Sequence, residues 1–255
     1  MPIGVVLVGD ELLSGKRRDK HLERTVEMLD VRGLALSWVR IAGDDPQRLA
    51  DTFRQTLAGG DIVLSFGGIG ATPDDCTRQA VAAAAGLPLV PHPEAVALLR
   101  AKYGSEATPQ RLRMVEFPQG ARMIPNSYNQ IPGFTLADHH FVPGFPQMAW
   151  PMTEWVMDHY YAHLHQERMI EFLARVEGAY ESQLIQLMQQ VIDDYPGVRV
   201  ASLPHLDGDN THIELGVRGV PALAGAAWEA LTAGLDARAV AWRRVSGGDP
   251  QDRLS

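Results

Sequence analysis

Short apolar runs alternate with amphipathic segments along the first 66 residues. Residues 3–8 form an unbroken apolar run, which is the pattern of a central parallel strand buried on both faces. Residues 34–41 and 62–66 repeat this pattern, and the amphipathic segments 19–32 and 44–60 between the runs are expected to form helices. This alternation with short connections predicts a parallel sheet with right-handed crossovers and helices on both faces.

The two predicted helices carry their own start and stop signals. In the first, Leu22, Val26 and Leu29 are spaced to face the core, and Gly33 is positioned as a stop. The second opens with an Asp-Asp-Pro sequence at 44–46 and ends at a glycine pair. Both signals support the helix assignments.

The order of the elements changes near residue 165. Before it we expect a strand, a helix, two short strands and a long helix, at 87–90, 94–103, 134–136, 140–142 and up to about 164. After it the order is strand, helix, strand, strand, helix, strand, at 169–176, 180–194, 198–203, 211–217, 222–233 and 239–245. We therefore predict a three-layer, mostly parallel α/β domain at 1–165, a small α+β (βαββαβ) domain at 166–246 and a flexible tail at 247–255.

A glycine-rich loop, Gly67-Gly68-Ile69-Gly70, follows the third predicted strand. Its glycines let backbone N–H groups approach an anion, and we expect Thr72 to cap the next helix, with a proline in its first position and the second acid of the Asp74-Asp75 pair in a capping box. A phosphate here would meet the positive end of the helix dipole. Two adjacent acids would repel that phosphate unless a divalent cation bridges them. The alternative is a tight turn whose acids only complement the dipole.

Several motifs at consistent spacing occur in order along the first two-thirds of the chain. They are Gly9-Asp10-Glu11-Leu12-Leu13-Ser14-Gly15, Gly43-Asp44-Asp45-Pro46, the loop from Gly67 to Thr77, Asn126 with Pro132-Gly133, and Pro143-Gly144-Phe145-Pro146. On these motifs the chain resembles the molybdopterin-binding (molybdenum cofactor biosynthesis, MoaB/MogA-like) superfamily. Within it, the chain is most similar to the amino-terminal part of CinA-type competence/damage-inducible proteins, and its last third resembles their small middle domain.

The resemblance implies a pocket for a nucleotide diphosphate or a pterin phosphate at the carboxyl ends of the strands. It implies Asp44 and Asp75 as catalytic residues of a metal-dependent pyrophosphatase acting on ADP-ribose, with Mg²⁺ or another divalent cation held by Asp44, Asp74 and Asp75. The ligand-binding residues that it implies are Asp10, Glu11, Ser14, Gly67, Gly68, Gly70, Thr72, Asn126, Gly133, Pro143 and Gly144. The alternatives are adenylyl transfer to molybdopterin, with molybdopterin bound, and nucleotide binding without catalysis.

The chain departs from the CinA pattern at three positions. Ala71 replaces a proline, His21 replaces an asparagine after the first loop, and Gln147 replaces an acid after the Pro-Gly-Phe-Pro turn. These changes weaken the case for catalysis and favour the binding-only alternative. These 255 residues contain no counterpart of the carboxy-terminal amidohydrolase domain, so we do not expect its activity on nicotinamide mononucleotide.

The composition limits the kinds of partner that the protein is expected to bind. A formal charge of −8 argues against nucleic acid or an anionic membrane as a partner, and we expect a small-molecule ligand. We also expect a homo-oligomer, although the charge does not bear on this. One cysteine, Cys76, excludes an intrachain disulfide and is expected to pack as a small hydrophobe. No apolar run approaches the roughly 20 residues of a membrane span, and the start lacks a signal-peptide pattern. We therefore expect a cytoplasmic protein.

Three further features have both functional and structural interpretations. The basic cluster Lys16-Arg17-Arg18 lies where it could contact a phosphate, or it could be a solvated surface. His159 and His163, four residues apart, are interpreted as exposed helix-end residues and not as metal ligands. A Gly-x-x-Gly sequence at 216–219 mimics an RNA-binding loop, but acids outnumber basic residues around it, so RNA binding is not expected.

Overall fold

The buried apolar runs of the sequence form a mostly parallel sheet in the first structural unit, Met1–His165. The computed structural model describes residues 1–205 and 211–247. The sheet has the order β2-β1-β3-β8-β7-β6. The first four strands pair in parallel, β7 pairs antiparallel with β8, and β6 pairs antiparallel with β7. The strands are β1 (Ile3–Val8), β2 (Trp38–Ala42), β3 (Ile62–Phe66), β6 (Arg122–Ile124), β7 (Gly133–Leu136) and β8 (His139–Val142). The α/β fold predicted from the pattern is therefore confirmed.

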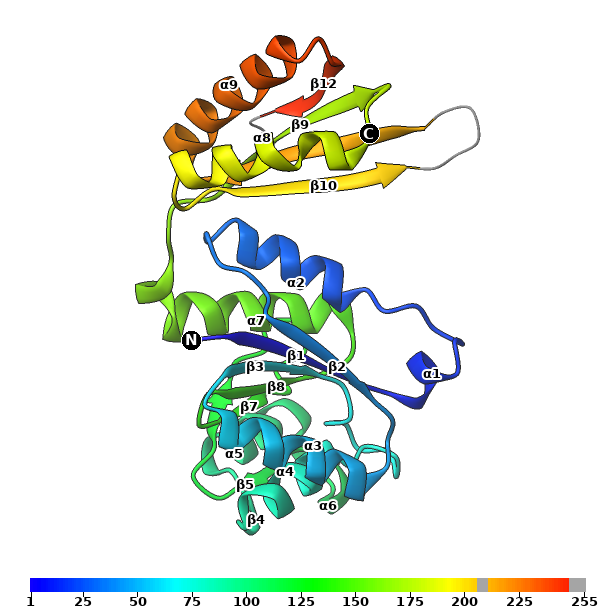
Figure 1. Ribbon diagram of the computed structural model, residues 1–255. Helices are drawn as coiled ribbons and strands as arrows, with labels where there is room; N and C mark the ends of the chain where they lie inside the picture. The colour runs from blue at the N-terminus through cyan, green and yellow to red at the C-terminus, as the bar shows by residue number, and fades with distance from the viewer. Residues whose placement is uncertain (206–210, 248–255) are drawn as a thin grey trace. The chain divides into compact units, whose positions relative to one another are not determined.

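Helices cover both faces of this sheet (Figure 1). On one face, α2 (His21–Asp30) and α7 (Pro146–Tyr160) pack on the side chains of β1 and β3. On the other lie α3 (Pro46–Gly59), α4 (Thr77–Ala85) and α5 (Pro93–Tyr103), which share a second apolar cluster. Each core strand alternates its apolar side chains between the two clusters, so both faces are dry.

Two predictions about the helices are wrong. Leu29 is buried as predicted, but Leu22 and Val26 are exposed, and His21, Thr25 and Met28 join Leu29 on the face of α2 that packs on the core. The polar residue His21 occupies a core position, which shifts the buried face away from the one that the leucine and valine spacing indicated. The second error concerns α4, which begins at Thr77 with Cys76 as its N-cap. The acids and the proline before it form a turn and are not helical.

The sequence analysis assigned no element between residues 104 and 133, and the structure has several short ones there. One of them, β5 (Glu116–Pro118), pairs with β4 (Leu89–Pro91), which was predicted at 87–90, in a separate two-stranded sheet. Between these strands lie α5, the one-turn helix α6 (Pro109–Leu112) and two 3-10 turns. Elements of three or four residues are too short to show a hydrophobic period, which is why the sequence did not reveal them.

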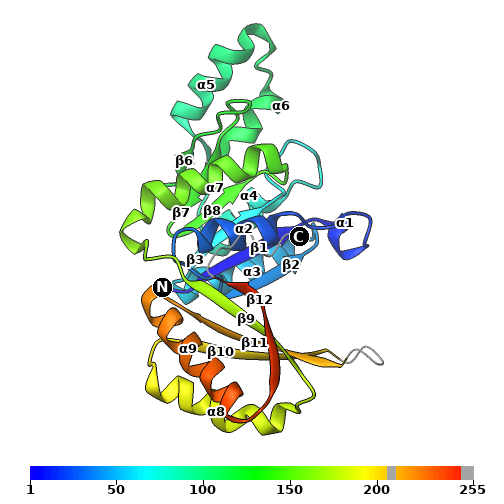
Figure 2. The same cartoon turned by 90° about the horizontal axis from the view of Figure 1, so that it is seen from above.

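The second unit, Gln166–Ser255, has the βαββαβ order that the sequence predicts. Its elements are β9 (Ile170–Glu177), α8 (Glu181–Asp194), β10 (Arg199–His205), β11 (His212–Gly219), α9 (Pro221–Ala237) and β12 (Ala241–Gly247). The antiparallel sheet has the order β10-β11-β9-β12, and both helices pack on one of its faces (Figure 2). The predicted tail lies outside the described residues from 248 onward. In the described part of the chain, no helix combines the length and the apolar character needed to cross a membrane.

Candidate functional site

The four parallel strands end at the same edge of the sheet, and the loops that follow β1 and β2 bring two aspartates together. Gly9 N–H donates to the Ala42 carbonyl at 3.0 Å, which extends the pairing of the two strands past their ends. The backbone N–H of Asp10 then donates to Asp44 Oδ2 at 2.9 Å, and the N–H of Asp44 donates to Asp10 Oδ1 at 3.2 Å. Each carboxylate is thus fixed by the main chain of the other's loop.

Negative charge is concentrated around Asp44. Burial raises the pKa of the Asp44 carboxyl, and the charges of Asp10, Glu11 and Asp74 raise it further, against the opposing hydrogen bond from the Asp10 N–H. A cation at this position would relieve the repulsion. The predicted metal ligands Asp44, Asp74 and Asp75 are not a preassembled set, because over the described ranges no three acids have oxygens within 4.8 Å of one another.

The glycine loop after β3 runs close to the end of β1. Gly67 and Gly68 have φ of 102° and 69°, and a Cβ on Gly67 would overlap the Val8 carbonyl oxygen. Thr77 ties the loop to the start of α4, because its N–H donates to the Gly68 carbonyl at 3.0 Å and its hydroxyl to the Gly67 carbonyl at 3.1 Å. Only glycines allow this path, as the sequence indicated.

The segment between the glycines and α4 is closed by Thr72 and Asp75. Asp75 Oδ2 accepts hydrogen bonds from the Thr72 N–H at 2.8 Å and from the Thr72 hydroxyl, and the Asp75 N–H donates back to the Thr72 carbonyl at 3.0 Å. The Thr72 hydroxyl can donate to Asp74 instead, and this hydrogen bond lowers the pKa of that fully exposed acid. Thr72 therefore holds an acid in this turn and does not cap the helix as we had predicted.

Arg78 supports this turn, and the sequence analysis missed it. Its side chain is buried in the first turn of α4 and donates to the Gly70 carbonyl at 2.7 Å and to the Arg113 carbonyl. Burial lowers the pKa of the guanidinium, and the charges of Asp75 and Glu116 partly offset this effect. One signal was available, because Arg78 is the sole charged residue of an otherwise alanine-rich helix.

A pocket of about 490 Å³ opens at the ends of β1 and β3. Its lining includes the apolar residues Leu7, Val8 and Phe66 and the turn from Gly144 to Pro146. It also includes the segment before α2, which carries the basic residues Lys16, Arg17, Arg18 and Lys20. Glu11 lines the pocket and also belongs to the acidic group around Asp44, so the pocket and the acids adjoin.

His21 forms part of the pocket wall. Its ring stacks on Phe66 with centroids 4.5 Å apart, and its Nε2 lies 3.2 Å from the Gly144 carbonyl oxygen. Burial is the main cause that lowers the pKa of His21. The neutral ring must then carry its proton on Nε2 to donate to this carbonyl, which leaves Nδ1 as an acceptor. His21 thereby holds the predicted residue Gly144 beside Gly67.

The remaining predicted ligand contacts make local structural interactions. The Ser14 hydroxyl donates to the Glu11 carbonyl at 3.4 Å. Asn126 is buried and uses its side chain within its own turn, donating to Ile131 O at 2.9 Å. A Cβ on Gly133 would overlap the Phe141 carbonyl, so this glycine is needed for strand pairing. Pro143 follows β8 at the edge of the site, next to Gly144.

The other candidates do not line the pocket. His159 stacks on Trp155 with centroids 4.4 Å apart and forms part of an aromatic group. Cys76 is buried, as predicted for a small hydrophobe, and its thiol contacts the Asp44 carbonyl at 3.2 Å. The glycines at 216 and 219 lie within strand β11, so they do not form a loop.

Sequence comparison matches almost the whole first unit to one protein family. The family model described as a probable molybdopterin binding domain matches residues 4–163. A CinA-like protein of Anaeromyxobacter sp. (strain K) is 33% identical over 237 residues, covering 89% of this chain and 57% of the relative. A CinA-like protein of Anaeromyxobacter sp. (strain Fw109-5) is 32% identical over 217 residues, covering 80% of this chain and 53% of the relative. The chain thus spans little more than half the length of these relatives.

Among solved structures, the protein CinA with unknown function from Thermoplasma acidophilum is 29% identical to this chain, with a TM-score of 0.56. The similarity covers 62% of this chain and 97% of that chain.

Proposed function

Because the chain belongs to the family of probable molybdopterin binding domains and is CinA-like, we propose that its pocket binds a nucleotide diphosphate or a pterin phosphate together with a divalent cation and hydrolyses a phosphoanhydride of the ADP-ribose type. One observation carries this proposal. A pocket with basic residues in its lining adjoins a group of acids through Glu11, at the carboxyl ends of the parallel strands. The family resemblance inferred from the motifs is confirmed by the match over residues 4–163.

The pocket suits a flat ring that carries phosphates. Its volume of about 490 Å³ falls within the usual range for small-molecule sites. The half-exposed Phe145 offers apolar surface for a ring, whereas Phe66 and His21 are buried and stack on each other. The basic residues of the lining supply charge for phosphate oxygens, which compensates locally for a net charge of −8.

The acids suit a hard cation shared with the ligand. Mg²⁺ in phosphate sites is commonly held by one or two carboxylates, with phosphate oxygens and waters completing its shell. Asp10 and Asp44 present oxygens fixed by backbone N–H groups, and the repulsion that raises the pKa of Asp44 would fall once a cation is bound. A preassembled cage is therefore not required, and the wide spacing of the acids is compatible with the proposal.

The chain's own residues then have distinct tasks. Arg17 and Arg18 bind and orient the phosphates, and the glycine loop lets them approach the sheet edge. A bound divalent cation would supply charge neutralisation and polarise the phosphate. Water attacks one phosphorus, a new P–O bond forms as the bridging P–O bond of the phosphoanhydride breaks, and the bridging oxygen leaves with the second phosphate. Asp75 accepts one proton of the water on Oδ1 while Oδ2 stays bonded to Thr72, and the other proton stays on the newly formed phosphate.

The test is hydrolysis of ADP-ribose in Mg²⁺ by the unmodified chain and three variants. Asp44→Asn should lower the rate by about 100-fold or more because the cation loses a charged ligand. Arg17→Gln with Arg18→Gln should raise KM by about tenfold. The control, Arg100→Gln with Lys102→Gln, removes two exposed charges from α5 and should change neither quantity.

The same experiment distinguishes hydrolysis from the second candidate function, which is binding without catalysis. The separation of Asp44, Asp74 and Asp75 is the observation that favours it. If the unmodified chain binds ADP-ribose but releases no product with Mg²⁺, Mn²⁺ or Co²⁺, the hydrolase proposal fails and the binding function takes its place. If Arg17→Gln with Arg18→Gln binds as tightly as the unmodified chain, the ligand occupies another site.

A further inference from the structure

Two histidines and a glutamate come together on the antiparallel sheet of the second unit. His205 ends β10 and His212 begins β11, and the two residues are direct cross-strand partners. Glu214 lies two residues further along β11, on the same face of the sheet as His212. The residues between and after them, Ile213 and Leu215, point to the opposite face and pack in the core with α8 and α9. The three polar side chains thus share the face that the helices do not cover.

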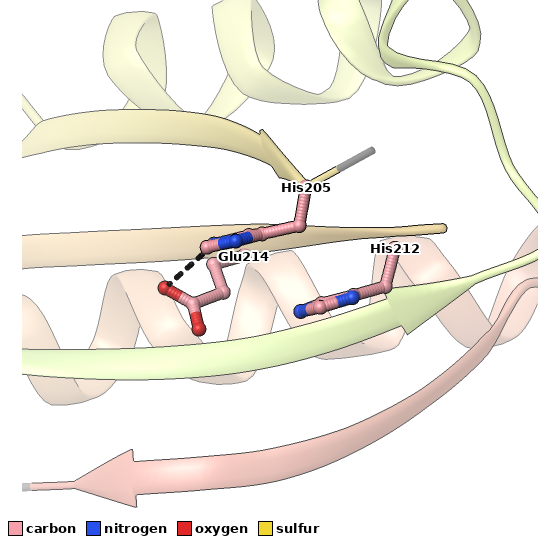
Figure 3. Close-up of side chains that lie close together, drawn as sticks. All are labelled: His205, His212 and Glu214. Atoms are coloured by element: carbon pink, nitrogen blue, oxygen red, sulfur yellow. Dashed lines mark ion pairs between the residues drawn. The ribbon is translucent and has the colours of Figure 1, made fainter. Parts of the chain in front are cut away.

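The three side chains are close enough to share one ion. The two imidazole rings are nearly parallel, at 3°, with centroids 4.6 Å apart, and the Glu214 carboxylate lies beside them (Figure 3). His205 Nε2 and Glu214 Oε2 are 3.5 Å apart. One ligand atom from each residue lies within 4.8 Å of the other two. In the portion of the chain with described side chains, this is the one such group of three or more potential metal ligands.

One nitrogen in this group, on His205, lacks a hydrogen bond among the described residues. His205 Nε2 is buried and receives no hydrogen bond from a described residue, although its ring is about one-third exposed. Glu177 is the partner of His212 on β9 and adds a second acid to this corner. The positive charge nearest in register, Arg175, opposite Glu214, already pairs with Glu177 at 3.0 Å. An unsatisfied imidazole nitrogen next to a carboxylate is an arrangement that a metal ion would complete.

We propose that His205, His212 and Glu214 form a binding site for a first-row transition metal of the Zn²⁺ class. Two imidazoles and one carboxylate are a recurrent ligand set for Zn²⁺, and such a set leaves a fourth position for water or an external ligand. Imidazole nitrogen also favours Zn²⁺, Ni²⁺ and Cu²⁺ over Mg²⁺ and Ca²⁺. The site is thus chemically distinct from the all-oxygen group in the first unit.

Binding requires only side-chain rotation. Zn–N and Zn–O bonds of about 2 Å place two tetrahedral ligands roughly 3.3 Å apart, so the present spacing of up to 4.8 Å must contract. Rotation of His205 at the end of the edge strand β10 can supply this movement while the paired backbones stay in register. The ion would then cross-link β10 to β11 and stabilise the edge of the sheet.

The test is a calorimetric titration of the full chain with Zn²⁺, and with Co²⁺ as a spectroscopic probe. The unmodified chain should bind one equivalent that His205→Gln and His212→Gln each weaken by about 100-fold, and Glu214→Gln should weaken it less. Co²⁺ should give a visible band typical of nitrogen ligation that both histidine variants lose. His163→Gln, which removes an exposed histidine from the first unit, is the control and should leave binding unchanged.

Two further measurements separate loss of the metal site from misfolding and from failure of the site in the first unit. Circular dichroism of His205→Gln without metal should match that of the unmodified chain, because this side chain is only half-buried. The Asp44→Asn variant should retain the histidine-dependent equivalent, so failure of the site in the first unit leaves this proposal standing. If Zn²⁺ binds with the same affinity and stoichiometry to the unmodified chain and to both histidine variants, or does not bind at all, the proposed site does not exist.

Discussion

At the scale of single residues, main-chain hydrogen bonds hold the candidate catalytic acids in place. Asp10 and Asp44 each accept an N–H from the other's loop, and Asp75 accepts one from Thr72. The sequence indicated these acids because each follows a strand end or a glycine loop. Arg78 stands out in the sequence only as the sole charged residue of an alanine-rich helix, and its role depends on carbonyls at Gly70 and Arg113 that come together only in the folded chain.

Asp44→Asn should separate stability from function. The amide oxygen can still accept the Asp10 N–H, while the repulsion from Asp10, Glu11 and Asp74 disappears. Because Asp44 is partly exposed, solvent screens this gain, and we expect Tm without metal to rise by only about 1–3 °C. Added Mg²⁺ should stabilise the unmodified chain and not the variant. If scanning calorimetry without metal gives the variant a lower Tm than the unmodified chain, the neighbouring acids do not destabilise Asp44 by repulsion.

His139 and His140 should make the first unit sensitive to acid. Burial lowers the pKa of His139 to about 4, and burial together with the charges of His139 and Arg122 lowers that of His140 to about 3. Their Nε2 atoms lie 2.9 Å from the Thr56 hydroxyl and 2.7 Å from the Tyr161 hydroxyl. Tyr161 donates its own proton to Asp138 at 2.8 Å, so His140 must be the donor in its bond to Tyr161.

Between pH 6.5 and these lowered pKa values the unfolded chain binds protons that the folded chain excludes, so stability is complete above pH 6.5 and is lost as pH falls. At pH 5 we expect each histidine to cost about 2 kcal/mol of unfolding free energy. Urea unfolding at pH 7 and pH 5 should therefore show a loss that is about 2 kcal/mol smaller in His139→Gln, which keeps a donor for Thr56. Equal losses in the variant and the unmodified chain would mean that His139 is protonated in the fold.

At the scale of elements, long runs were predictable and short or shifted ones were not. β1, β3 and the start of α3 follow from apolar runs and from an Asp-Asp-Pro signal, and Asp45 indeed caps α3 through the Arg48 N–H at 2.8 Å. The start of α4 was misplaced because Thr72, a proline and two acids imitate a helix start. Tertiary contacts override this local preference, because Thr77 and Arg78 donate hydrogen bonds to the carbonyls of the glycine loop and α4 begins only at Thr77.

Arg78→Lys should loosen the glycine loop. Lysine keeps the charge but cannot reach the Gly70 and Arg113 carbonyls together as a guanidinium does. One buried carbonyl would lose its donor, which should cost about 1–3 kcal/mol in denaturant unfolding and weaken nucleotide binding as well. Arg48→Lys, at an exposed position of α3, serves as the control. Unchanged stability in Arg78→Lys would show that the two hydrogen bonds do not hold the loop.

At the scale of the whole molecule, the chain consists of two units with separate cores. Two apolar clusters lie within the first unit and a third within the second. Parallel and antiparallel sheets need different connections, which is why the sequence analysis placed a domain boundary near residue 165, where the order of the elements changes. The metal site of the second unit was not predictable, since the pairing of His205 with His212 depends on strand register.

Limited proteolysis should release the two units as stable fragments. Residues 165–169 have no regular secondary structure and connect α7 and its following turn to β9. The first cuts of the full chain by trypsin or by a glutamate-specific protease are therefore expected in this segment, and mass spectrometry will identify them. Early cleavage inside residues 20–90 would contradict two independent cores.

If one site in the first unit binds phosphate and cation together, binding calorimetry of ADP-ribose with and without Mg²⁺ will show that each ligand strengthens binding of the other. The charges of Asp10, Glu11, Asp44 and Asp74 repel a free nucleotide and attract its cation complex. We predict that Mg²⁺ tightens binding to the unmodified chain by about tenfold or more and that Asp44→Asn loses most of this gain. Equal affinity with and without Mg²⁺, or no measurable binding in either case, would contradict the account.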